Sequence, residues 1–103
     1  MINVVAVITM KPGQREAFLA AFKENVAAVH AEDGCIAYDA FVDAEGFGSF
    51  QAPFGPDAVV ILERWASGAD ALKAHARAPH MAAYSAKTKD MVAERAIHIL
   101  TAA

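Results

Sequence analysis

The sequence has little of what marks several classes of protein. Its 103 residues include a single cysteine, Cys35, which rules out a disulfide within the chain and suits a reducing compartment. The net charge is −3, and the lysine and arginine residues do not cluster along any predicted helix or strand. Nucleic-acid binding is therefore not expected.

Long apolar runs are also absent. No stretch is long enough to predict a transmembrane helix. The N-terminal run Ile2–Met10 has no basic segment before it and no small-residue cleavage site after it, so it does not resemble a signal peptide. It is rich in Val and Ile, which is typical of a strand. We expect a cytoplasmic protein that does not associate with membranes.

The length predicts a single domain over residues 1–103. Apolar residues make up 56% of the chain, which is enough for an ordinary core. A chain this short nevertheless buries a modest fraction of its surface. Both faces of the strand predicted over Ile2–Thr9 are substantially apolar, so both should be covered. The sequence therefore predicts a homodimer that packs sheet against sheet.

Periodicity and turn residues predict the other elements. After a turn at Lys11–Gly13, a helix begins near Gln14, and Gly34 is expected to cap its C-terminus. Ser67 is the expected N-cap of a later helical segment. The remaining strands and helical segments are expected at Ile36–Val42, Ala58–Trp65, Ser67–Ala78, His80–Met91 and Ala93–Leu100. The order β-α-β-β-α-β predicts an α+β, ferredoxin-like fold with an antiparallel sheet.

The connection Ala44–Asp57 is longer than a hairpin needs. It contains three aromatic residues, Phe47, Phe50 and Phe54, among glycines and prolines. Solvated loops rarely carry three such rings, so we expect them to pack on something. A lid over a pocket and an arm laid across a partner subunit are equally good interpretations.

Most of the candidate functional side chains lie between Val59 and Met81 in the sequence. On strand alternation, Glu63 and Trp65 share one face with Val59 and Ile61. A carboxylate and an indole beside two aliphatic side chains predict the floor of a pocket or an interface. For Trp65, a place in the core is the alternative to a place in the pocket wall.

Two histidines follow on the next helical segments. His75 lies three residues after Leu72, toward the apolar face, where a neutral imidazole could act as a general base. Its alternative is a structural hydrogen bond to a backbone carbonyl. His80 follows Pro79 and could contact a ligand or cap a helix. Glu63 could orient one histidine or form an ion pair with Arg95 or Arg77.

Tyr38 and Tyr84 could donate hydrogen bonds to a substrate oxygen, or pack in the core with the hydroxyl at its rim. A metal site is not expected, because His75 and His80 are separated by Pro79 and do not stack on one helical turn. No glycine-rich phosphate loop or dinucleotide-binding pattern is present.

Four segments in this order carry a family resemblance: Lys11-Pro12-Gly13, Glu32 to Tyr38, Glu63-Arg64-Trp65, and His75 to His80. Together they resemble the antibiotic biosynthesis monooxygenase family, over nearly the whole chain. The resemblance implies a ferredoxin-like fold and a homodimer of the dimeric α+β barrel type. It also implies a pocket between sheet and helices in each subunit.

The resemblance further implies oxidation of phenols or quinols by dioxygen, with no metal, flavin or haem. His75 would then remove the substrate proton, and Trp65 and the phenylalanines of Ala44–Asp57 would provide apolar walls. An isomerase of a small phosphorylated ketose is one alternative, although Lys73 and Arg77 are only scattered candidates for holding the phosphate. A dimeric module that binds a small ligand without catalysis is another.

Overall fold

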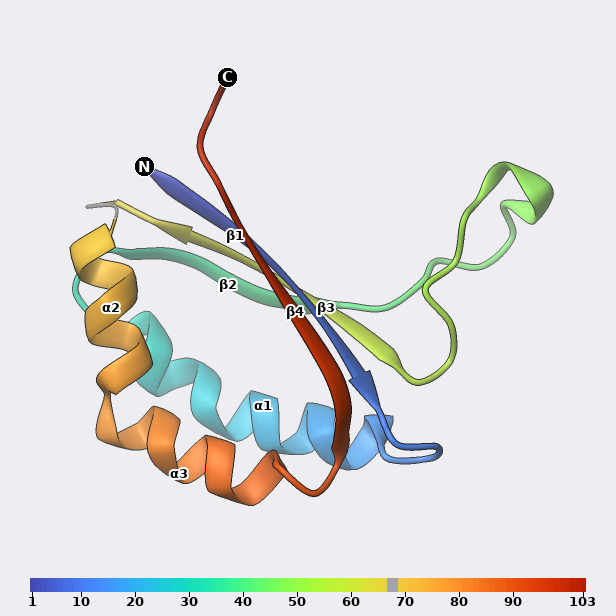
Figure 1. The fold of residues 1–103 in the computed structure, drawn as a ribbon, viewed down its shortest axis with the longest axis horizontal. Helices are drawn as coiled ribbons and strands as arrows, with labels where there is room; N and C mark the ends of the chain where they lie inside the picture. Colours follow the sequence, from blue (N-terminus) through green and yellow to red (C-terminus); the bar gives the residue numbers. More distant parts are fainter. Residues whose placement is uncertain (67–68) are drawn as a thin grey trace.

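A computed structural model describes residues 1–66 and 69–103 (Figure 1). It confirms the predicted α+β fold of ferredoxin-like order, with the second helical part in two pieces. The elements are β1 (Ile2–Met10), α1 (Arg15–His30), β2 (Cys35–Phe41), a short 3₁₀ turn (Gly48–Phe50), β3 (Ala58–Trp65), α2 (Ala69–Arg77), α3 (Pro79–Thr88) and β4 (Val92–Leu100).

The four strands form one open antiparallel sheet in the order β2-β3-β1-β4. In this register Ala6 of β1 pairs with Ile61 of β3 and with Ile97 of β4. Side chains on neighbouring strands at paired positions point to the same face. One face of the sheet therefore carries an apolar row across three strands.

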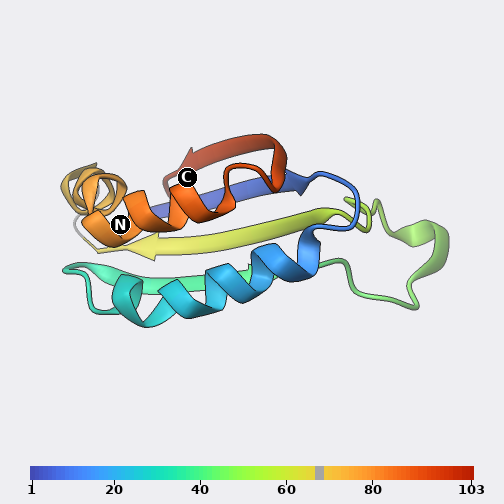
Figure 2. The same cartoon turned by 90° about the horizontal axis from the view of Figure 1, so that it is seen from below.

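The helices pack on this apolar face of the sheet and not on the other face. Figure 1 shows all three on one side of the sheet, and Figure 2 shows them in front of the strands. The shortest extent of the molecule, 20 Å, runs across the strands of the sheet, because Figure 1 looks along that axis and shows the strands one behind another. The first helix turns one apolar stripe toward the sheet, and Phe18, Phe22 and Val29 of this stripe are buried in the core.

The sequence predicted two helix caps, at Gly34 and Ser67. α1 ends at His30, where the Ala31 amide donates to the Ala27 carbonyl at 3.1 Å, so the prediction that Gly34 caps this helix was wrong. Gly34 has a φ of 82° and instead provides the left-handed residue of the turn that enters β2. The expected cap at Ser67 lies outside the described residues.

The other face of the sheet carries exposed apolar side chains. Val5 and Val7 of β1 are half-buried there, and Leu62 and Phe41 are 40% and 49% exposed. Among the described residues, no helix lies on this side (Figure 1). The strand Ile2–Thr9 is thus apolar on both faces as predicted, and the second face is open to a partner.

The long connection between β2 and β3 projects away from the body. It extends beyond the strand ends, on the side of the sheet opposite the helices (Figure 1). Asp43 fixes its base by accepting hydrogen bonds from the amides of Phe54 and Gly55 at 3.0 and 2.8 Å. Phe47, Phe50 and Phe54 are exposed, with Phe50 94% exposed. These rings do not pack on their own chain.

Within the part of the chain that the structure describes, no helix combines the length and apolar character needed to cross a membrane.

Replacing Phe22 tests the link between the helical layer and the sheet. Its ring is buried and stacks on Tyr38 of β2, with 5.0 Å between ring centroids. We expect Phe22→Ala to lower the free energy of unfolding by about 3–5 kcal/mol and Phe22→Leu by less than about 1.5 kcal/mol. Urea unfolding followed by circular dichroism measures both. Equal, small losses would show that this contact does not hold the layers together.

Candidate active site

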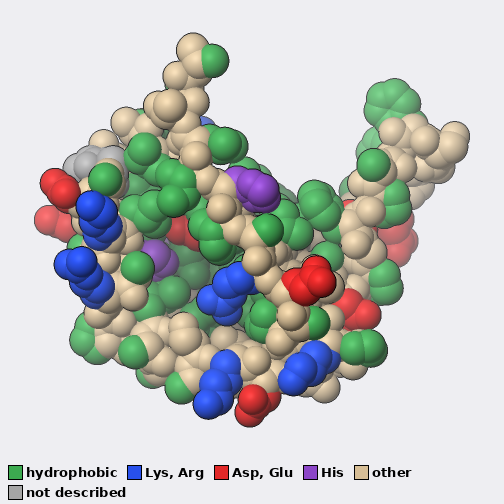
Figure 3. Space-filling view, in the orientation of Figure 1, with side chains coloured by type: hydrophobic (Ala, Val, Ile, Leu, Met, Phe, Trp, Pro, Cys, Tyr) green, Lys and Arg blue, Asp and Glu red, His purple; other side chains and the backbone are tan. Residues whose placement is uncertain are grey.

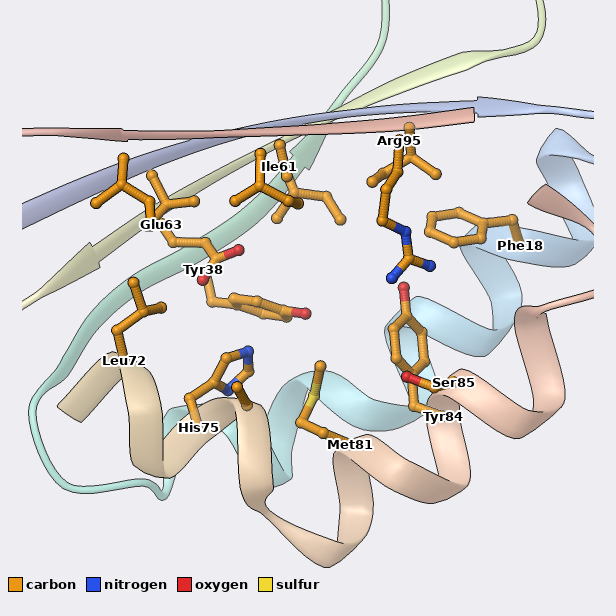
Figure 4. Close-up of a pocket in the computed structure, with 16 residues that line it drawn as sticks. Phe18, Tyr38, Ile61, Glu63, Leu72, His75, Met81, Tyr84, Ser85 and Arg95 are labelled. Atoms are coloured by element: carbon orange, nitrogen blue, oxygen red, sulfur yellow. The ribbon is translucent and has the colours of Figure 1, made fainter. Parts of the chain in front are cut away.

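A cavity of about 350 Å³ lies between the sheet and the helices. Figure 3 shows it as a hollow lined mainly by hydrophobic side chains, and Figure 4 shows the lining residues. Apolar side chains from β1, β3 and β4 form one wall, and α2 and α3 form the other. The polar side chains in the lining are Tyr38, Glu63, His75, Tyr84, Ser85 and Arg95.

His75 of α2 is the most constrained of these groups. It is 6% exposed, and its Nδ1 lies 2.8 Å from Oε2 of Glu32. A carboxylate only accepts hydrogen bonds, so Nδ1 carries the proton and donates it. In the neutral form of the ring this leaves a lone pair on Nε2, and Figure 4 shows the ring directed into the cavity toward Tyr38. This is the arrangement of a general base held in one tautomer by a carboxylate.

Glu32 also meets the second histidine. Nε2 of His80 lies 3.3 Å from Oε2 of Glu32, although the geometry is not that of a hydrogen bond. Nδ1 of His80 lies 3.1 Å from Oδ1 of Asn25. His80 lines a smaller hollow of about 210 Å³ between α1 and α3, not the main cavity. His80 thus lies close to the Glu32 carboxylate but outside the main cavity.

Trp65 and Glu63 lie on the inner face of β3, as strand alternation predicted. The indole Nε1–H of the fully buried Trp65 donates to Oε1 of Glu63 at 3.0 Å. Trp65 does not line the cavity but packs against His75, with 4.8 Å between ring centroids. Burial raises the pKa of Glu63 above its ordinary value of 4.5, and the Trp65 hydrogen bond and His75 oppose this rise.

Tyr38 and Tyr84 both line the cavity, and Tyr38 also belongs to the buried core, so neither of the two interpretations is excluded. Burial raises the pKa of each phenol above its ordinary value of 10.0, so both hydroxyls stay protonated and can donate to a ligand oxygen. Tyr38 lies edge-on to His75, with 5.6 Å between ring centroids. Figure 4 shows Tyr84 near Arg95, at a distance from His75.

The structure places other candidates elsewhere. Phe47, Phe50 and Phe54 do not line the cavity of their own chain. Lys73 and Arg77 are exposed on α2 and do not line it either. Among residues 1–66 and 69–103, no group of three or more His, Cys, Asp and Glu side chains is placed to hold a metal ion.

Two functional candidates were missed from the sequence. Glu32 appeared only within a family segment, and nothing in its local pattern showed that α1 ends early enough to turn its carboxylate toward α2. Arg95 was considered only as an ion-pair partner for Glu63. Its alternation with Ile97 and Ile99 on the last strand was the available signal, because those residues share the face that lines the cavity.

The sequence profile of the antibiotic biosynthesis monooxygenase family matches residues 1–87. The chain belongs to this family. Among curated proteins, no sequence matches it.

Solved structures with the same fold cover nearly the whole chain. Rv0793 from Mycobacterium tuberculosis is 26% identical, with a TM-score of 0.79 over 99% of this chain and 94% of that one. A conserved protein from Methanosarcina mazei is 25% identical, with a TM-score of 0.79 over 96% and 89%. A structure described as an antibiotic biosynthesis monooxygenase is 24% identical, with a TM-score of 0.81 over 100% and 99%, a likeness of fold.

Glu63 gives a pH-dependent prediction. Burial raises the pKa of the Glu63 carboxyl, so the folded state favours the neutral acid over the carboxylate. The neutral acid makes its full contribution to the free energy of unfolding at pH values below the pKa that Glu63 has in the unfolded chain. This contribution is lost as the pH rises through the pKa that Glu63 has in the folded protein. Glu63→Gln cannot ionise, yet it keeps an oxygen that accepts the Trp65 hydrogen bond. We expect its free energy of unfolding, relative to wild type, to increase from about pH 4 to pH 8.

Urea unfolding at a series of pH values, followed by the fluorescence of the single tryptophan, measures this difference. The control is Glu94→Gln on β4, which removes an exposed carboxylate. A Glu63→Gln difference that stays constant across the pH range would contradict the assignment.

Proposed function

We propose that this protein is a monooxygenase that oxidises a phenolic or quinol-type aromatic with dioxygen. The observation that carries the proposal is the buried Glu32–His75 pair at the wall of an apolar cavity. Membership in the antibiotic biosynthesis monooxygenase family supports the class of reaction.

In the first step, His75 Nε2 removes the proton of the substrate hydroxyl. The imidazolium that forms is stabilised by Glu32, at 2.8 Å from the other nitrogen. Taking up a proton beside a carboxylate in a water-poor site costs less than it would without that charge. The products of this step are an electron-rich phenolate and a protonated His75.

In the second step, the phenolate gives one electron to dioxygen, and the two radicals combine to form a C–O bond. Proton transfer and loss of water then leave a carbonyl at the attacked carbon. One oxygen atom enters the product and the other leaves as water, so the substrate supplies all the electrons. Glu63 lines the same cavity as His75, and burial raises the pKa of its carboxyl, which favours the protonated form that would supply a proton to the leaving oxygen.

The isomerase alternative receives less support from the cavity. A small phosphorylated ketose carries several polar oxygens, whereas most of this lining is aliphatic or aromatic. Of the cationic candidates, Lys73 and Arg77 lie outside the cavity, and Arg95 alone of the lysines and arginines lines it within the described residues. A dianionic phosphate is usually held by more donors than this.

The experiment is oxygen uptake by metal-free protein with a panel of naphthols, anthrols and quinols, against a no-protein control for autoxidation. We expect His75→Ala to lower kcat/KM by about 10²–10⁴-fold, because a positioned base contributes that much. Glu32→Gln should lower it less, since the amide oxygen still accepts from Nδ1. His30→Ala, which removes an exposed imidazole at the end of α1, should leave it unchanged.

Uptake equal to the no-protein control with every substrate would contradict the oxygenase. Uptake that His75→Ala retains would keep the oxygenase and remove His75 as its base.

We also propose that the protein is a homodimer joined through the open face of the sheet. The support is the apolar side chains that this face exposes, including Val5, Val7 and Leu62, and the position of the β2–β3 arm on the same side. A two-sided apolar sheet with one face open would leave a large exposed patch on a monomer. The arm, with Phe50 at its exposed tip, is then placed to lie across the partner.

Leu62→Asp tests this interface. Leu62 lies in the middle strand β3, between Val5 of β1 and Asp39 of β2, so a new carboxylate there would be buried unpaired in a dimer. We expect wild type to sediment as a dimer at micromolar concentration and Leu62→Asp as a monomer. Ala20→Asp, at an exposed site on α1, should remain dimeric. A monomeric wild type would contradict the proposal.

A further inference from the structure

The cavity has a cationic side chain that the reaction as described does not use. Arg95 lies on β4, paired with Ile8 of β1, and its side chain lines the cavity. Figure 4 shows its guanidinium turned into the cavity toward the hydroxyl of Tyr84. Within residues 1–66 and 69–103, no hydrogen bond or ion pair to another side chain engages it.

The polar groups of the cavity divide between two ends. His75, Glu63 and Tyr38 lie at the end beside α2, and Arg95 and Tyr84 lie at the end beside α3 (Figure 4). The side chains of Ile61 and Met81 lie between them in Figure 4. The cavity therefore offers a base and an acid at one end, an apolar middle, and two hydrogen-bond donors with one positive charge at the other.

A ligand that satisfies both ends must carry an anion opposite the group that reacts. An arginine beside apolar walls is best matched by a planar carboxylate, which accepts two parallel hydrogen bonds from the guanidinium. The phenol of Tyr84 stays protonated because burial raises its pKa, so it can donate a third hydrogen bond. Glu63 lies at the other end, where it does not compete for the guanidinium.

We propose that the substrate is a hydroxyaromatic carboxylic acid, bound with its carboxylate at Arg95 and Tyr84 and its hydroxyl at His75. This inference rests on the proposed function and specifies its substrate class. A cavity of about 350 Å³ is at the small end of ligand pockets and suits a compound of two or three fused rings. The carboxylate anchor would fix which ring hydroxyl meets the base.

The test uses matched pairs of compounds: a hydroxynaphthoic acid, its methyl ester and the corresponding naphthol. The acid and the ester share a ring system and a hydroxyl but differ in charge. For each compound, oxygen uptake gives kcat/KM and isothermal titration calorimetry under anaerobic conditions gives Kd. We expect wild type to bind the acid about 10–100-fold more tightly than the ester, as a charge-assisted contact provides.

Arg95→Gln should remove this preference, raising Kd for the acid about 10–100-fold while leaving the ester and the naphthol unchanged. Arg95→Lys should restore part of it, because the charge remains but the planar pair of donors is lost. Arg77→Gln removes an equal charge from the exposed face of α2 and should leave all three Kd values unchanged. Arg95 is exposed at the rim, so these variants should fold normally, which circular dichroism checks.

The two proposals fail in different ways. If the acid binds in an Arg95-dependent manner but no compound consumes oxygen above the control, the oxygenase is wrong and the ligand class stands. If oxygen is consumed but acid and ester behave alike in wild type, or Arg95→Gln affects both equally, the ligand class is wrong and the oxygenase stands. Loss of acid binding in Arg77→Gln as well would show a general charge effect and would also overturn the role of Arg95.

Discussion

The proposed chemistry depends on one hydrogen bond, between the buried His75 and the partly buried Glu32. It joins α2 to the loop that follows α1, so the proposed chemistry requires these two segments to keep their relative position. It also fixes the tautomer, which leaves the basic nitrogen toward the cavity. Trp65 packs against the ring, and His80 approaches the carboxylate from behind. The proposed base is therefore held by groups that do not line the cavity, which is how a side chain is kept in one orientation.

Most of the fold could be predicted from local pattern. The bounds of β3 were predicted without error, and alternation along it placed Glu63, Trp65 and Ile61 on the inner face. The bounds of a strand and the alternation of its side chains both follow from a pattern of burial over a few residues. The end of α1 could not be predicted in the same way. Ala31 and Gly34 are both acceptable near a helix end, and tertiary contacts around Glu32 decide between them.

The site was predicted in part, for a physical reason. His75, Glu63, Tyr38 and Tyr84 each lie on an apolar face, so periodicity sends them inward. Glu32 lies in a turn, where there is no periodicity to follow, and its partner is 43 residues away in the chain. The phenylalanines of the β2–β3 arm are exposed on their own chain, so their packing stays a prediction: an aromatic ring indicates burial but does not tell whether its own chain or another provides the cover.

The last strand stands apart from the rest of the site. The match to the family profile ends at residue 87 and β4 begins at Val92, so the strand that carries Arg95 lies outside the matched segment. β4 is also an edge strand, paired with β1 alone. A substitution there alters one rim of the cavity without disturbing His75, Glu32 or Trp65. Under the proposed roles, changes on β4 would therefore alter which molecules bind while the proton transfer at His75 stays intact.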